Sequence, residues 1–250
     1  MPSPFRPHTK TEKHSTWVKA THWIGTLSFI FLLFSGIEII MVHPRFYWGN
    51  TGNDLMPALF ELPLSRNYHH NGWTKPAPFF TSIGSPVSAS RTYDIFNQNG
   101  WGRSLHFLSA WFLVITSLLY LLMAIIAGHL KNIWPGGKDI SFRSITGDLL
   151  AHLRNRTEFV KGPNYGPLQK ISYSIVLFFL FPVIILSGLT MSPAIAAACP
   201  FLLKMFFGAQ SARTIHFFAA TLLSIFLIVH IIMIVRTGFL KHMKAMTFEK

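Results

Sequence analysis

Cysteine and charged side chains are scarce in this 250-residue chain, and each shortage excludes a class of protein or site. The single cysteine, Cys199, excludes a disulfide framework, a cysteine-rich zinc site, an iron–sulfur cluster held within the chain and a CxxCH motif for covalent haem attachment. Only 12% of the residues are charged, which is half of the roughly 25% found in soluble domains. Because 50% of the residues are hydrophobic and 24 are Phe, the composition indicates a membrane protein.

Four apolar segments are long enough to cross the hydrocarbon core of a bilayer, which takes roughly 20 helical residues. We expect spans at approximately Thr21–Val42, Ser104–Gly128, Ile171–Met191 and Thr214–Val235. The first run is too long for the core of a signal peptide, and the MVHPRFYWG that follows has no small-residue cleavage site, so we expect it to remain as a span. The sequence predicts an all-α integral membrane four-helix bundle, with residues 1–250 forming one domain.

Basic residues are distributed unevenly around these spans. The N-terminal tail, the loop between the second and third spans and the C-terminal tail together hold 15 of the 22 Lys and Arg. Cytoplasmic loops carry an excess of Lys and Arg, so we expect both termini in the cytoplasm of a bacterium with this chain in its inner membrane. The net charge of +13 is interpreted as a topology signal, with no nucleic-acid surface, because the basic residues flank apolar runs.

The loop of residues 43–103 is then expected on the periplasmic side. It is rich in Trp, Tyr, Phe and Pro, whereas a disordered tether is poor in aromatics. One interpretation is a lid that packs on the bundle, and the other is a docking platform that uses Tyr47, Trp48 and Trp73, because aromatics are enriched at interface cores. Both interpretations can hold at once.

The segment Ser192–Gln210 is apolar but interrupted by Pro193, Pro200 and Lys204. It is too interrupted to span the membrane. We expect a short interfacial segment here, with a helix lying along the outer membrane surface.

Four histidines lie inside the expected spans, where an ionisable side chain is costly and is usually functional. They are His22, His106, His216 and His230. On the fourth span, His216 and His230 are 14 residues apart, which places them within about 40° of one helix face and about 21 Å apart along the axis. With the N-terminus inside, depth pairs His106 with His216 near the outer surface, and His22 with His230 near the cytoplasm.

Each histidine pair can supply both axial ligands of a six-coordinate haem iron. Zinc normally takes four protein ligands, or three and a water, and pairs of histidines do not provide that number. For any one of the four taken alone, a helix–helix hydrogen bond is the simpler interpretation. Together they favour two non-covalently bound haems, with all four histidines as iron ligands.

Three basic residues stand one helical turn before a histidine, in the motifs KATH, RSLH and RTIH. Lys19, Arg103 and Arg213 are therefore placed to meet the anionic propionates of haem at the aqueous edge. The alternative is that they are boundary charges that set topology, and the same residues can do both. Glu38 is the only acid inside a span, and it is either a proton acceptor for quinol or a carboxylate that reaches the interface.

These spans resemble a known family. The matching motifs are VKATHWIG and SGIEI in the first span, GRSLHFLSAW in the second, LQKISYSIVLFF and PVIILSGLTMSP in the third, and RTIHFFAATLLSIFLIVHIIMI in the fourth. On these motifs the chain resembles the bacterial di-haem cytochrome b family, which includes the b-type subunits of nickel–iron hydrogenases, formate dehydrogenases and thiosulfate reductases. MVHPRFYWGNTG looks most like the thiosulfate-reductase-type branch, whose partners are often periplasmic molybdenum enzymes. The resemblance implies two haem b groups with this ligand pairing, and electron exchange between quinone and a partner enzyme.

Three functions stay open at the level of sequence. The first is a respiratory electron-transfer subunit, not an independent enzyme, that connects the quinone pool to a periplasmic, molybdopterin-dependent oxidoreductase. The second is a stand-alone quinol-linked redox cytochrome, and the third is a haem or metal transporter or chaperone. In the first, electrons leave through the outer haem, so we expect quinone to react near the inner haem at His22 and His230. A site near Glu38 is the rival.

Overall fold

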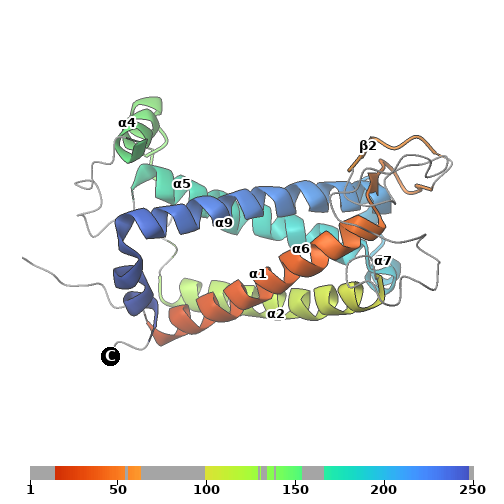
Figure 1. The fold of residues 1–250 in the computed structure, drawn as a ribbon, viewed down its shortest axis with the longest axis horizontal. Coiled ribbons are helices and arrows are strands. Elements are labelled where there is room, and N and C mark those ends of the chain that lie inside the picture. The colour runs from red at the N-terminus through yellow and green to blue at the C-terminus, as the bar shows by residue number, and fades with distance from the viewer. Residues whose placement is uncertain are drawn as a thin grey trace, which may run out of the picture. The chain divides into compact units, whose positions relative to one another are not determined.

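The computed structural model describes residues 15–53, 56–62, 99–128, 130, 134–137, 139–153 and 166–247. Four helical runs in it are long and apolar enough to cross a membrane: Thr16–Val42, Gly100–Ile126, Pro167–Thr190 and Ala209–Leu240. No more than 22% of the most apolar window of each run is buried inside the protein, so most of these side chains face outward, where lipid can solvate them. The predicted all-α membrane architecture is confirmed (Figure 1).

The first two spans are α1 (Thr16–Val42) and α2 (Asn99–Ile126), and both begin before their expected starts. The backbone carbonyl of Ser15 accepts the N–H groups of Val18 and Lys19 at 3.0 and 3.2 Å, so α1 starts ahead of its apolar run. Hydropathy marks the part of a helix that suits hydrocarbon, whereas the backbone hydrogen bonds continue into the polar flank.

The third span consists of α5 (Pro167–Ile175), the π-helical turn η4 (Val176–Leu180) and α6 (Phe181–Thr190). Sequence analysis predicts one unbroken helix here and misses the wide turn. Pro182 accounts for it, because proline lacks an N–H and its ring clashes with the carbonyl four residues earlier in a regular helix. The N–H that follows η4 reaches back five residues instead of four.

Two short helices, α7 (Pro193–Ala198) and α8 (Phe201–Met205), occupy the segment expected to be one interfacial helix. Cys199 separates them with φ −130° and ψ 68°. Pro200 follows it, and the residue before a proline is pushed out of the helical region, so the prediction of a single helix is wrong. Its place on a membrane surface stays a prediction.

The fourth span is α9 (Ala209–Met246), which is interrupted by a non-helical Gly238 at φ 114° and ψ 85°. Glycine tolerates this left-handed backbone because it has no Cβ. After Gly238 the chain changes direction, as the dark blue end of the ribbon shows (Figure 1). A further helix, α4 (Phe142–Leu153), precedes the third span.

The chain divides into two compact units, and each of the four spans contributes to both. Unit 1 is Met1–Trp23, Leu119–Ser174 and Leu227–Lys250, and unit 2 is Ile24–Leu118 and Ile175–Phe226. Unit 1 therefore holds His22 and His230, and unit 2 holds His106 and His216. These are the two pairs that sequence analysis assigns to opposite depths.

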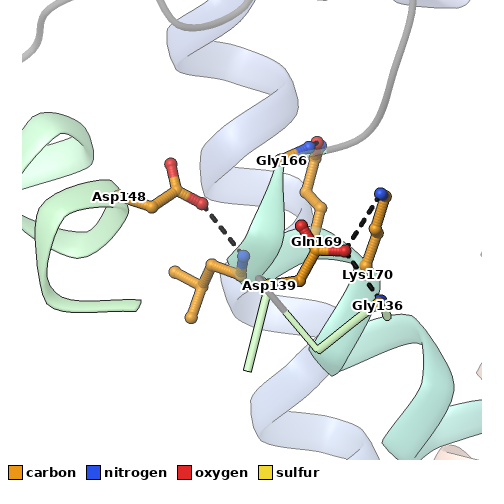
Figure 2. Close-up of polar contacts among 7 residues, drawn as sticks. Gly136, Asp139, Asp148, Gly166, Gln169 and Lys170 are labelled. Atoms are coloured by element: carbon orange, nitrogen blue, oxygen red, sulfur yellow. Dashed lines mark hydrogen bonds and ion pairs between the residues drawn. The ribbon is translucent and has the colours of Figure 1, made fainter. Parts of the chain in front are cut away.

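In unit 1, two aspartates bind the start of α5 (Figure 2). Leu168 N–H donates to Asp148 Oδ2 at 2.9 Å, and Lys170 Nζ donates to Asp139 Oδ2 at 3.2 Å. The first bond satisfies an N–H that the helix itself leaves free, at the end where the helix dipole favours negative charge. A hydrogen bond from Gly136 N–H, and then one from Lys170, lower the pKa of the Asp139 carboxyl below its usual value.

Also in unit 1, two side-chain hydrogen bonds connect the start of α1 to the end of α9. Trp23 Nε1 donates to Met246 O and Lys19 Nζ donates to Thr247 O, both at 2.8 Å. The last carbonyls of a helix have no partner within the helix, so these two side chains complete the C-terminal end of α9.

In unit 2, residues 45–46 and 60–61 of the 43–103 loop form a small β-ribbon. Strands β1 (Arg45–Phe46) and β2 (Phe60–Glu61) pair antiparallel, and Arg45 Nε lies 3.4 Å from Glu61 Oε1. Phe46 stacks on Phe60 and packs on Phe217 of α9, with both pairs of ring centroids 4.6 Å apart. The ribbon therefore covers the beginning of α9.

The turn that follows β1 caps α9. Gly49 O accepts the N–H groups of Gln210 and Ser211 at 2.9 and 3.2 Å, and Gly49 N–H donates to Ser211 Oγ at 2.6 Å. These bonds satisfy free N–H groups in the first turn of the helix. The segment of residues 43–53 thus packs as the lid interpretation expects, whereas Trp73 and residues 63–98 lie outside the described residues.

Candidate functional site

Unit 2 brings two of the four predicted ligands close together. His106 comes from α2 and His216 from α9, and their ring centroids are 6.2 Å apart with an angle of 61° between the ring planes. The outer pair inferred from depth alone is therefore a pair in space.

A serine contacts Nδ1 of each of these rings. Ser35 Oγ of α1 lies 3.0 Å from His106 Nδ1, and Ser187 Oγ of α6 lies 3.1 Å from His216 Nδ1. Both serines are fully buried, at 0% exposure, so water does not compete for the two imidazoles there. Since Nδ1 is engaged in both rings, Nε2 is the nitrogen left to face a metal.

A glycine follows each serine and lies against the same ring. A Cβ on Gly36 would meet His106 Cε1 at 3.8 Å, and a Cβ on Gly188 would meet His216 Cε1 at 3.2 Å. The first distance is ordinary contact, whereas the second is tighter than most Cβ contacts, so the α6 side has no spare room. A Ser–Gly pair from the preceding span thus supports each histidine.

The spacing of the two rings fits a haem iron between them. Two metal–nitrogen bonds of about 2 Å on opposite sides of one iron bring the imidazole centres to about 6 Å. The observed 6.2 Å agrees with that separation. Within the described residues, no group of three or more His, Cys, Asp or Glu side chains could hold a metal ion.

The three basic residues predicted to meet propionates have different surroundings. Arg213 Nη2 donates to the carbonyl of His43, and its guanidinium lies 5.1 Å from the centre of the Phe46 ring. Lys19 binds the end of α9 in unit 1, as described above. Arg103 is exposed and helps to line an open hollow of α2, and its contact with haem propionate, like that of the other two, stays a prediction.

The inner pair, His22 and His230, lies in unit 1. The His22 ring stacks on that of Trp23, with centroids 5.5 Å apart and 16° between the planes. A further histidine, His242, lies beyond the Gly238 break, where its Nε2 is 2.9 Å from Thr237 Oγ1. The joint ligation of one iron by His22 and His230 stays a prediction.

Comparison with known proteins agrees with this geometry. The family model described as prokaryotic cytochrome b561 matches residues 13–249. The chain belongs to the prokaryotic cytochrome b561 family. It is therefore a multi-pass membrane haem protein of electron transfer, and haem b is the cofactor that its family binds.

A relative carries a more specific name. The chain is 24% identical over 221 residues, covering 88% of its own length and 89% of the relative, to the putative protein-methionine-sulfoxide reductase subunit YedZ1 of Azospira oryzae. No solved structure matches the chain.

Sequence analysis missed the two serines. Neither Ser35 nor Ser187 is near its histidine along the chain, with 71 and 29 residues between the partners. The available signal was the pair SG, present in both SGIEI and SGLTMSP, each in the span that precedes an RxxH motif. A repeated polar residue followed by glycine inside an apolar span points to a helix contact.

Proposed function

We propose that this chain is the haem-carrying membrane subunit of a two-part oxidoreductase, and that it passes electrons between the quinone pool and a separate periplasmic enzyme. The observation that carries the proposal is the His106–His216 pair at 6.2 Å, with both Nδ1 atoms already engaged by serine. Bound haem supplies one-electron chemistry at its iron, and the protein sets where that iron lies and how it is solvated.

We place a second haem between His22 and His230 of unit 1. The excess of Lys and Arg in the tails and in the loop before the third span supports this end as the cytoplasmic one, with both termini inside. The outer haem is then the one nearest the periplasm, and quinone reacts near the inner haem. His216 and His230 are 14 residues apart on the fourth span, so the two haem irons would be offset by about 21 Å along the helix axis. Electrons would pass from one haem to the other across this part of the membrane.

The partner is a separate catalytic subunit of the periplasm. Two likenesses support this: the resemblance to the thiosulfate-reductase-type branch, whose partners are often molybdenum enzymes, and the relative named as a subunit of a putative protein-methionine-sulfoxide reductase. Of the two chemistries, we favour reduction of oxidised methionine, because that likeness extends over 88% of the chain.

The docking surface of residues 43–103 uses Trp48, but not Tyr47. Trp48 is 55% exposed and stacks on Phe207 at 6.1 Å, so it presents an aromatic face beside the lid. Tyr47 is only 6% exposed, and its hydroxyl donates to Asn53 O at 2.8 Å. The expectation that the Tyr47 side chain helps to form the surface is therefore wrong, because this side chain is buried in the lid.

Haem stoichiometry in single histidine variants tests the proposal. The purified chain is expected to hold two tightly bound haem b groups, and His106→Ala and His216→Ala should each remove the same one. His22→Ala and His230→Ala should remove the other, and reduction by a quinol analogue should stop in these two variants. His242→Ala is the matched control and should keep both haems.

The outcome separates the alternatives as well. Haem that exchanges readily with apomyoglobin would favour a transporter or chaperone. Two firmly bound haems without any co-purifying periplasmic enzyme would favour a stand-alone redox cytochrome. A His106→Ala variant with both haems and an unchanged spectrum would contradict the assignment of the ligands.

A further inference from the structure

The two buried serines each have a single proton, and the helix geometry shows where it goes. Ser35 Oγ donates to Phe31 O at 2.7 Å, one turn earlier on α1. Ser187 Oγ donates to Val183 O at 2.6 Å, one turn earlier on α6. A serine that donates back into its own helix has only lone pairs left for any other neighbour.

It follows that the proton between each serine and its histidine belongs to the imidazole. Ser35 Oγ accepts from His106 Nδ1, and Ser187 Oγ accepts from His216 Nδ1, at 3.0 and 3.1 Å. Both imidazoles are thereby fixed in the tautomer with hydrogen on Nδ1, so Nε2 of each ring carries the lone pair that a metal would take.

The same arrangement occurs twice, on two separate stretches of chain. In each case the serine comes from one span and the histidine from the next span along unit 2, and a glycine after the serine leaves room for Cε1 of the ring. The two planes are held 61° apart, and neither ring can turn without losing its bond to serine. A hydrogen bond to Nδ1–H also makes Nε2 a stronger electron donor.

We propose that Ser35 and Ser187 are positioning residues of the outer haem, and that they set the angle between the two axial imidazoles and lower the reduction potential of the iron. This inference rests on the proposed outer haem at His106 and His216. It assigns a role in electron transfer to two residues that touch the ligands and not the iron.

Two serine variants and two matched controls test the inference. Ser35→Ala and Ser187→Ala remove the hydroxyl acceptors and leave the backbone carbonyls of Leu32 and Ile184, which also bond these imidazoles. Ser28→Ala is the control on α1, because Ser28 is buried and donates to Ile24 O at 2.8 Å, one turn back. Thr190→Val is the control on α6, because Thr190 is also buried and donates to Leu186 O at 2.8 Å.

The readouts are haem content, the low-spin electron paramagnetic resonance signal and a redox titration of the purified protein. Each alanine variant should keep both haems, shift the signal of the outer haem and raise its midpoint potential. One hydrogen bond to a ligand changes such an equilibrium by up to about tenfold, and tenfold is about 59 mV for one electron. Ser35→Thr and Ser187→Thr keep a hydroxyl and should restore both properties, while the controls should match the unmodified protein.

Several results would overturn the inference. One is an unchanged signal and potential in both alanine variants while the unmodified protein holds its outer haem. Another is loss of haem that the threonine variants do not restore, because that would indicate packing alone. Failure of the proposed function is recognised separately, since His106→Ala and His216→Ala would then leave the outer haem in place.

Discussion

His106 is held between α1 and α2, and His216 between α6 and α9. The two sites have the same hydrogen-bonding partner for the imidazole but differ in how closely the neighbouring helix packs on the ring. Both have a buried serine on Nδ1, but a Cβ on Gly188 would meet its ring at 3.2 Å and one on Gly36 at 3.8 Å. The start of α9 is also bound by the lid through Gly49, whereas the start of α2 borders the open hollow. His216 is thus more closely packed than His106.

This difference shows how a binding site can be both precise and accessible. A close-packed interior transmits a displacement of a few tenths of an ångström to its neighbours, so we expect the α6/α9 side to fix the position of the proposed haem iron. The α1/α2 side keeps the same hydrogen bond with more freedom around it. Substitutions of matched type on the two sides should therefore have unequal effects.

The largest effect is expected from Gly208→Ala, which breaks the contact between the lid and α9. A Cβ there would clash with Gly49 O and lie 2.5 Å from Asn50 Oδ1, and the backbone has φ 116°. Gly49→Ala is the control, because it has φ 100° but open space. An L-residue in the left-handed region costs about 1–2 kcal/mol, so Gly49→Ala should lose that much and Gly208→Ala clearly more.

The thermal midpoint of the detergent-solubilised protein measures both glycine variants. Equal midpoints for the two would mean that the lid does not press on α9 as described.

A smaller effect is expected from Gly188→Ala, measured as the affinity of the apoprotein for haem b. The new methyl group must displace the His216 ring, and the iron site then loses its spacing, so affinity should fall at least several-fold. Gly36→Ala is the counterpart on the looser side, where 3.8 Å is an ordinary contact, and it should change affinity little. A larger loss in Gly36→Ala would reverse the comparison.

Arginine-to-lysine exchanges give a further contrast, measured on stability. Arg213→Lys keeps the charge but loses the bond to His43 O and the stacking on Phe46, so stability should fall by about 1–2 kcal/mol. Arg103→Lys changes an exposed side chain and should stay within about 0.5 kcal/mol. Denaturant titration of the two variants side by side measures the contrast, and equal losses would argue against a more firmly held α9 side.

The smallest effect on the chain itself is expected from Trp48→Ala. The side chain is exposed, so the free energy of unfolding should stay within about 0.5 kcal/mol of that of the original protein. Haem content should not change. Co-purification of the periplasmic partner should nevertheless decrease, because exposed aromatics carry much of an interface. Leu59→Ala is a suitable control, at 60% exposure on the same lid. If Trp48→Ala retained the partner fully, the lid would be only a cover for α9.

Hydropathy and histidine spacing predict much of this molecule from its sequence. The spans follow from apolar length alone, and the outer histidine pair follows from counting residues along helices. Three features do not follow. The starts of α1 and α2 lie in the polar flanks ahead of their apolar runs. The π-helical turn depends on how one proline is accommodated, and the break between α7 and α8 depends on Pro200.

The serines show a different limit of sequence reasoning. A serine inside an apolar span usually donates to its own helix, and Ser28 does only what that rule predicts. Ser35 makes the same bond and also accepts from a histidine 71 residues away. Only the packing of α1 on α2 distinguishes the two, and no local pattern contains that information.

The π-helical turn has a consequence for how the length of this chain varies among its relatives. Such a turn holds one more residue than an α-helical turn, while the side chains of the helix on either side keep their directions. A relative without a proline equivalent to Pro182 is expected to be one residue shorter within 176–180 and still to direct its serine at its histidine. An alignment of such relatives should therefore show a single-residue gap here, and not at Ser187.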